Sequence, residues 1–175
     1  MSETQKRLWR DGGFVKDDWR TVETIEAIED GDVILPLSLL LEGGVTLLSR
    51  NSGRTGVLLE AGDEVSAIEP FLDRLSLIAL SFPAFTDGRA YSKTVRLRQQ
   101  HGYEGEIRAV GDVLIDQVVF MQRCGFDALE VSHDVTANRL AEDRVPSVDL
   151  YYQPALDKAA ETPTYSWRRN AVQAR

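Results

Sequence analysis

The chain has 175 residues, of which 43% are hydrophobic and 27% are charged, and its formal net charge is −8 at pH 7. A chain of this length buries roughly 70% of the surface that its unfolded form exposes, which is enough for one compact domain. The acidic charge argues against a nucleic-acid-binding protein, because affinity for a phosphate backbone comes from clustered Lys and Arg side chains.

The N-terminus and the cysteine content further limit where the protein is expected and which kinds of site it can contain. Residues 1–13 are polar, and the apolar run at 33–41 is too short to span a membrane, so we expect a cytoplasmic protein with no membrane contact. The single cysteine, Cys124, excludes an intramolecular disulfide and a self-contained cysteine-ligated zinc or iron–sulfur site. Because the sequence also has only two histidines and no nucleotide-binding fingerprint, we expect no metal and no bound cofactor.

The first part of the chain predicts a β-hairpin followed by a short helix. Residues 7–10 and 14–16 flank Asp11-Gly12-Gly13, and glycine admits the positive φ that a tight hairpin turn needs. Residues 35–41, with a proline in the first turn, predict a short helix that ends at Gly43-Gly44.

From residue 56 onward, apolar strand segments alternate with helical segments. The predicted strands are 56–60, 75–82, 106–110 and 126–131, and the predicted helices are 65–72, 88–100 and 113–124. Strands and helices that alternate at this spacing form a mainly parallel sheet through right-handed crossovers. The sequence therefore predicts an α/β fold with an N-terminal hairpin, whose sheet is either open or curled like a half-barrel.

The chain divides into two predicted regions. Residues 1–144, including the hairpin, form the α/β domain, and 145–175 form an irregular C-terminal arm or tail. Proline and aromatic residues in this arm favour docking, either on its own domain or on another chain.

Polar and glycine residues gather where the predicted parallel strands end. Because ligands of such sheets bind outside the carboxyl ends of the strands, these residues mark a candidate anion- or partner-binding site. The candidates are Asp87, Gly88, Arg89, Arg108, Gly111, Asp112 and His133. We predict that Asp87, Arg89, Arg108 and Asp112 form one cluster.

Three of these candidates also have a structural explanation. Asp87 can act as a helix N-cap, and His133 can be an exposed loop residue. Arg108 stands in a strand that is covered on both faces, so it needs an ion pair with Glu106, Asp112 or another acid unless a ligand satisfies it. Ion pairing and ligand contact are compatible.

The predicted helix at 88–100 carries a basic face. Arg89, Lys93 and Arg96 follow the i, i+4, i+7 spacing of one helical side, and Arg98 adds charge beside them. In an acidic protein, this candidate basic face of Lys93, Arg96 and Arg98 can hold an anion or an acidic partner, although a solvated face is the commoner outcome.

No pattern identifies a catalytic residue. Ser132, His133 and Asp134 have the residue types of a catalytic triad, but adjacent side chains on an extended segment diverge. Cys124 stands near the end of a predicted helix, where the helix dipole does not stabilise a thiolate, and we therefore expect it to be packed rather than reactive.

Short motifs spread between residues 85 and 126 point to a family. They are Phe85-Thr86-Asp87-Gly88-Arg89, Tyr91-Ser92, Leu97-Arg98, Gly105-Glu106, Arg108-Ala109, Gly111-Asp112-Val113, Asp116-Gln117 and Arg123-Cys124-Gly125-Phe126. Through them the chain resembles an uncharacterised bacterial family labelled as oxidoreductases of sulfite reduction, whose members are typically encoded beside sulfite reductase. The resemblance covers the whole chain and implies a role in sulfate assimilation and cysteine biosynthesis.

Two functions compete. The first is an accessory protein of assimilatory sulfite reduction that contacts the sulfite reductase hemoprotein or its electron donor. The second is a small oxidoreductase or other enzyme in which Arg89 and Arg108 hold an anion and Asp87, Asp112 or His133 moves a proton. We favour the first because redox chemistry needs a cofactor and no cofactor motif is present. The same contact surfaces can also serve a homo-oligomer.

Overall fold

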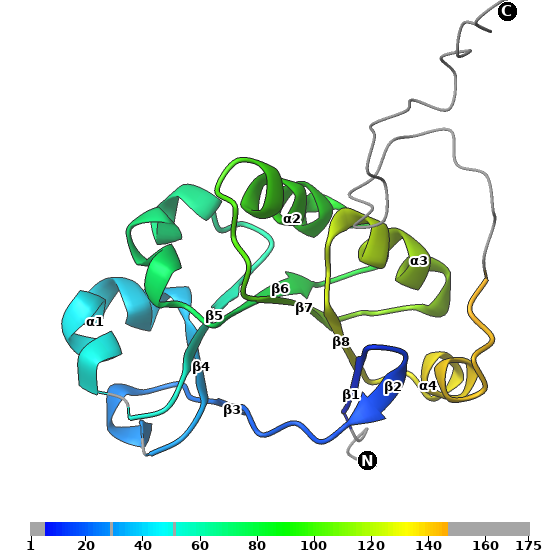
Figure 1. Cartoon of the computed structure of the whole chain (residues 1–175), viewed down its shortest axis with the longest axis horizontal. Coiled ribbons are helices and arrows are strands. Elements are labelled where there is room, and N and C mark those ends of the chain that lie inside the picture. Colours follow the sequence, from blue (N-terminus) through cyan, green and yellow to red (C-terminus); the bar gives the residue numbers. More distant parts are fainter. Residues whose placement is uncertain (1–5, 29, 51, 147–175) are drawn as a thin grey trace, which may run out of the picture.

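The computed structural model describes residues 6–28, 30–50 and 52–146, which form a curled sheet with helices along its outer side (Figure 1). Within these residues the sheet has eight strands in the order β2-β1-β8-β7-β6-β5-β4-β3. The strands are β1 (Arg7–Arg10), β2 (Gly13–Val15), β3 (Arg20–Thr21), β4 (Val33–Pro36), β5 (Thr55–Leu59), β6 (Leu77–Phe82), β7 (Glu106–Gly111) and β8 (Ala128–Val131). The helices are α1 (Leu37–Arg50), α2 (Arg89–Gln99), α3 (Ile115–Cys124) and α4 (Asp134–Ala141), together with the 3-10 helices η1 (Ile25–Ala27) and η2 (Val65–Arg74).

The strand order explains the curl. Strands β3 to β8 are parallel and pair in sequence order, so each right-handed crossover places its helix on the same face of the sheet. The other face is left concave, as in a half-barrel. The hairpin of β1 and β2 extends this sheet, because β1 pairs antiparallel with β8. The predicted α/β fold with an N-terminal hairpin is confirmed, and its sheet takes the half-barrel form.

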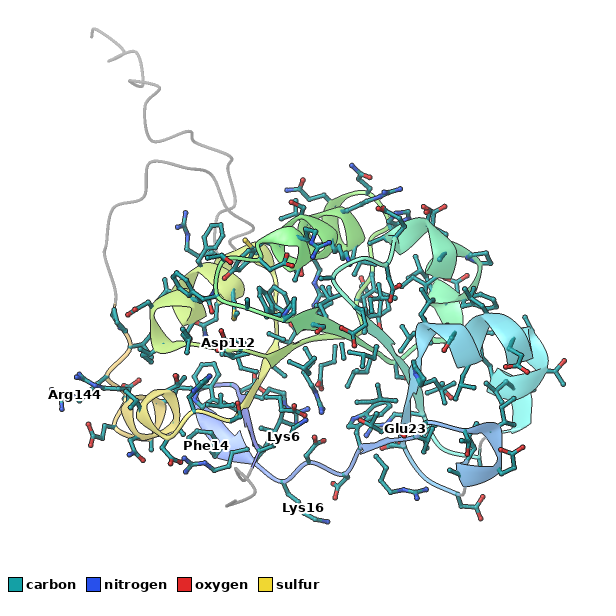
Figure 2. The ribbon with its side chains drawn as sticks, turned by 180° about the vertical axis from the view of Figure 1, so that it is seen from behind. Lys6, Phe14, Lys16, Glu23, Asp112 and Arg144 are labelled. Atoms are coloured by element: carbon teal, nitrogen blue, oxygen red, sulfur yellow. The ribbon has the colours of Figure 1, made fainter. Side chains whose placement is uncertain are left out.

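The two faces of the sheet carry separate cores. On β6, Ile78 and Leu80 belong to the large core that includes helix residues such as Leu97 of α2. The alternate residue Ala79 joins a small apolar cluster on the concave face, against which Trp19 packs. Side chains fill the space that the curl encloses (Figure 2).

The segment at 33–50 differs from the prediction. Val33–Pro36 is a strand, β4, and the helix that follows it continues past Gly43 with a kink at Gly44, where φ is 51° and ψ is −146°. The strand was missed because both of its faces are buried, and a short continuous apolar run has no period that separates strand from helix. The predicted stop does mark the position of the kink.

Three further elements differ. The predicted helix at 65–72 is the 3-10 helix η2, which contains Pro70. Strand β3 has two residues and helix α4 has eight, and neither was predicted. The predicted C-terminal arm lies outside the described residues from 147 onward. In the described part of the chain, no helix is both long and apolar enough to cross a membrane.

Candidate functional site

The loops that follow β6, β7 and β8 come together at the carboxyl edge of the sheet. The amide of Asp112 donates to the carbonyl oxygen of Phe82 over 2.8 Å, which ties the loop after β7 to the end of β6. His133 lies two residues beyond the end of β8. Strand β8 is the neighbour of β7 in the sheet. These contacts put two of the predicted site residues, Asp112 and His133, on neighbouring loops.

Asp112 and His133 form a direct pair. Oδ1 of Asp112 lies 2.8 Å from Nε2 of His133, and both side chains are partly open to solvent. A carboxylate in this position orients the imidazole ring. The other ring nitrogen, Nδ1, is left to exchange a proton with a bound group, so the pair has the geometry of an acid/base couple.

Asp87 and Arg89 also pair with each other. Oδ1 of Asp87 accepts from the backbone amide of Arg89 at 3.1 Å and from its Nε at 2.9 Å, while Oδ2 accepts from Nη2 at 2.5 Å. These hydrogen bonds from Arg89 lower the pKa of Asp87 to about 2. The N-cap residue of α2 is Gly88, so the explanation of Asp87 as the N-cap is wrong. Asp87 stands one residue earlier, where its carboxylate accepts from the amide of Arg89, the first residue of the helix.

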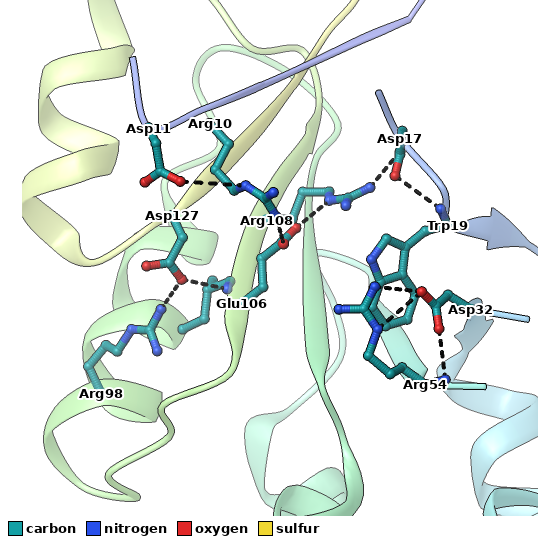
Figure 3. A network of polar contacts seen from close by, with 11 residues as sticks. Arg10, Asp11, Asp17, Trp19, Asp32, Arg54, Arg98, Glu106, Arg108 and Asp127 are labelled. Carbon is teal, nitrogen blue, oxygen red and sulfur yellow. Dashed lines mark hydrogen bonds and ion pairs between the residues drawn. The ribbon is translucent and has the colours of Figure 1, made fainter. Parts of the chain in front are cut away.

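Arg108 lies apart from these pairs, inside the curl of the sheet (Figure 3). It is 1% exposed, its Nε donates to Oε1 of Glu106 at 2.9 Å, and its Nη1 donates to Oδ2 of Asp17 at 2.7 Å. Oε2 of Glu106 also accepts from Nη1 of Arg10 at 3.1 Å. The ion pair with Glu106 that we expected as the structural alternative is present.

The predicted single cluster of Asp87, Arg89, Arg108 and Asp112 does not form. Instead, Asp87 binds Arg89, Asp112 binds His133, and Arg108 binds carboxylates on the concave face. Arg108 stays apart because it stands in the middle of β7 and not at the end of the strand. There its guanidinium pairs with carboxylates inside the curl.

The predicted basic face divides into two parts. Arg89, Lys93 and Arg96 line one pocket, as their spacing indicated. Arg98 instead turns inward, donates to the carbonyl oxygens of Gly125 at 3.1 Å and Gly105 at 2.9 Å, and pairs with Asp127. Arg98 therefore fastens α2 to the amino ends of β7 and β8.

The two glycines among the candidates differ in what they require. Gly111 has φ of 93°, and a Cβ there would lie 2.5 Å from the carbonyl oxygen of Phe82, so no other residue fits without a shift. A Cβ at Gly88 would meet only the ring of Tyr91, at 3.8 Å. Close approach of the β6 and β7 strand ends thus depends on Gly111.

An exposed aromatic patch lies beside this edge. We define it by Phe85, Tyr91 and Phe120; the rings of Tyr91 and Phe120 have centroids 4.7 Å apart, and Phe85 and Phe120 are 53% and 40% exposed. Nε2 of Gln117, one turn before Phe120 on α3, donates to the carbonyl oxygen of Phe85 at 3.3 Å. The patch therefore joins the loop after β6 to α2 and α3.

This patch was not predicted, although the sequence contains a signal for it. The apolar run Val118 to Met121 is continuous, while a helix buries only one side. Val118 and Met121 are fully buried, which leaves Phe120 on the open side. A continuous apolar run in an amphipathic helix thus indicates an exposed apolar residue.

Among the described residues, no group of three or more His, Cys, Asp or Glu side chains is placed to hold a metal.

Residues 56–164 match a family model described as bacterial protein of unknown function, DUF934. The chain belongs to this family. No curated protein matches it.

The DUF934 match covers the carboxyl edge but not the whole fold. It begins in β5 and includes both carboxyl-edge pairs and the aromatic patch. It does not include the hairpin or Asp17, so part of the Arg108 network comes from residues outside the matched range.

Proposed function

We propose that this DUF934 protein is an accessory protein of assimilatory sulfite reduction, acting by association with the sulfite reductase hemoprotein or its electron donor. The aromatic patch is the observation that carries the proposal. Two of its residues, Phe85 and Tyr91, belong to the motifs through which the chain resembles the family of sulfite reduction. The expected role is in sulfate assimilation and cysteine biosynthesis.

The chemistry of the patch suits a protein partner. Interface centres are enriched in aromatic and Arg side chains, which bury a large area on contact. Phe120 and Phe85 expose apolar rings on a chain of net charge −8, and Arg123 follows Phe120 by three positions on α3. A partner that covers these rings removes them from water, a gain of about 25 cal/mol for each Å² of apolar surface.

The second candidate function, a small oxidoreductase or other enzyme with an anionic ligand, draws support from the Asp112–His133 pair. That pair has acid/base geometry at the edge where parallel sheets bind ligands. However, the anion clamp of this hypothesis required Arg89 and Arg108 together, and each already binds a carboxylate at a separate place. The accessory function does not need such a clamp, and we prefer it for that reason.

The experiment is a co-purification with the sulfite reductase of the same cells. We expect a tagged copy to retain the reductase, and cells without the protein to need sulfide or cysteine while still forming sulfite. Phe120→Ser and Phe85→Ser should reduce the retained reductase at least tenfold with the fold unchanged by circular dichroism. The matched control is Val135→Ser, which changes an exposed apolar residue on α4 outside the patch.

Two results would contradict the proposal. One is retention of the reductase that is equal for the patch variants and the control. The other is a purified protein that carries stoichiometric flavin and turns over sulfite without the reductase, which would favour the enzyme.

A further inference from the structure

A second feature, separate from the aromatic patch, is a pocket of about 230 Å³ between α2 and the segment that leads into η2. Its lining consists of Ala61, Glu64, Val65, Arg89, Ser92, Lys93 and Arg96. Three cations and one carboxylate stand in this lining, so positive groups exceed negative ones by two in a protein whose net charge is −8.

Lys93 is the lining residue whose ammonium group is best placed to bind an anion. An ammonium group has three N–H donors. Nζ of Lys93 donates to the carbonyl oxygens of Glu60 at 2.6 Å and Ala61 at 3.1 Å, which leaves one donor for the pocket. Burial lowers the pKa of Lys93, because its charged form loses hydration there. A bound anion would stabilise the charged form further, as the nearby carboxylates of Asp63, Glu64 and Asp87 already do in part.

The two arginines have partners and still keep donors. Asp87 takes Nε and Nη2 of Arg89, which leaves Nη1. Nη2 of Arg96 reaches Oε1 of Glu69 at 3.3 Å, whereas its buried Nε has no hydrogen-bond partner among the described residues. Because this Nε has almost no surface open to solvent, the Arg96 donor left for an anion is Nη1, which makes no hydrogen bond with the described residues.

The size of the pocket selects the kind of acceptor. At about 30 Å³ for each water, its volume holds on the order of seven or eight water molecules. That is room for an anion of four or five heavy atoms with part of its hydration shell. Ser92 adds a hydroxyl that can donate to the same anion.

We propose that this pocket binds a small oxyanion of the sulfate, sulfite or phosphate type, with the Lys93 ammonium as the anchor and Arg89, Arg96 and Ser92 as further donors. The assignment is independent of the accessory function, because it concerns the purified chain and a different surface. Association with the reductase can fail while the anion binds, and the reverse result is equally distinguishable.

The test is isothermal titration calorimetry on the full chain with sodium sulfate, sulfite and phosphate, each at an ionic strength held constant with chloride. We expect one saturable site. The anion that binds with the highest affinity is the preferred ligand of the pocket. Lys93→Gln should weaken binding at least tenfold. Lys16→Gln is the matched control, because the exposed Lys16 ammonium pairs with Asp18 outside the pocket, and its affinity should equal that of the parent chain.

Lys93 also holds two loop carbonyls, so its replacement can disturb the fold. Arg89→Gln then serves as the second variant, because the Arg89 side chain is exposed and its loss should still weaken binding severalfold. The proposal is overturned if none of the three anions gives a saturable heat, or if a folded Lys93→Gln or Arg89→Gln chain binds as tightly as Lys16→Gln.

Discussion

Asp17 and Arg108 are 91 positions apart in the chain, yet Oδ2 of Asp17 accepts a hydrogen bond of 2.7 Å from Nη1 of Arg108. Asp17 belongs to the segment between β2 and β3, the two strands at opposite edges of the sheet. Arg108 belongs to β7, in the middle of the concave face (Figure 3). The pair therefore fastens the segment that runs between the edges to the inside of the curl.

Replacing Asp17 should destabilise the protein by this route. Asp17→Asn leaves the Arg108 guanidinium, which is 1% exposed, with Glu106 as its remaining carboxylate contact among the described residues. Removing one partner of a fully buried pair costs about 3–5 kcal/mol, and because the Asp17 side chain is 30% exposed we expect a smaller loss of about 2 kcal/mol. The measurement is the urea concentration at the midpoint of unfolding, compared between variant and parent chain at an unchanged m value.

The neighbouring residue provides the control. Asp18 is more exposed than Asp17 and pairs with Lys16 at the surface, so Asp18→Asn should change the unfolding free energy by less than about 0.5 kcal/mol. Equal midpoints for the two variants would mean that the Asp17–Arg108 contact contributes nothing to stability.

Gly111→Ala should destabilise the carboxyl edge. The residue has φ of 93°, and the added Cβ would lie 2.5 Å from the carbonyl oxygen of Phe82. A strained backbone costs about 1–3 kcal/mol, and the close contact adds to it. Gly62→Ala is the control, because a Cβ there meets no atom within 4 Å. A Gly111→Ala chain that unfolds at the same urea concentration as Gly62→Ala would contradict this account.

Much of the fold was readable from local signals. Strands at 55–59, 77–82 and 106–111 were predicted closely because apolar runs bounded by turn residues mark them. The helix predicted at 113–124 ends at Cys124, and the next residue, Gly125, adopts the left-handed φ of 104° that favours glycine. These features depend on residues close together in sequence.

The parts that sequence could not supply depend on distant partners. Nothing near Arg108 indicates Asp17, because that contact exists only once the hairpin pairs with β8 and the curl closes. The approach of Asp112 to His133 follows from β7 and β8 being neighbours, but which of the edge residues would meet was not readable. For Arg98, a helical spacing suggested the basic face, whereas four acceptors on other segments turn it inward.

Asp87 should titrate unusually low. Hydrogen bonds from Arg89 lower its pKa from 3.8 to about 2. Since the folded-state pKa lies below the unfolded one, its stabilising contribution is present above about pH 3.8 and is lost as the pH falls through about 2. The Arg89 side chain is 60% exposed, so high salt should weaken the effect.

Side-chain carboxyl NMR shifts measure the Asp87 midpoint directly. Arg89→Gln should move it up toward 3.8, because the first cause of the shift is removed. The control is Arg144→Gln, which removes an exposed cation that pairs with Glu142, and it should leave the Asp87 midpoint near 2. An Asp87 midpoint that Arg89→Gln leaves unchanged would assign the shift to another group.

Cys124 should behave as a packed side chain rather than a nucleophile. It is 6% exposed at the end of α3, and burial raises the pKa of its thiol, so the thiolate fraction at pH 8 is smaller than for a free cysteine. We therefore expect the native chain to react with a disulfide reagent at least about tenfold more slowly than the urea-unfolded chain, in which the same thiol is open to solvent. Complete labelling of the native chain at the unfolded rate, with the circular dichroism spectrum unchanged, would show instead that Cys124 is a reactive thiol.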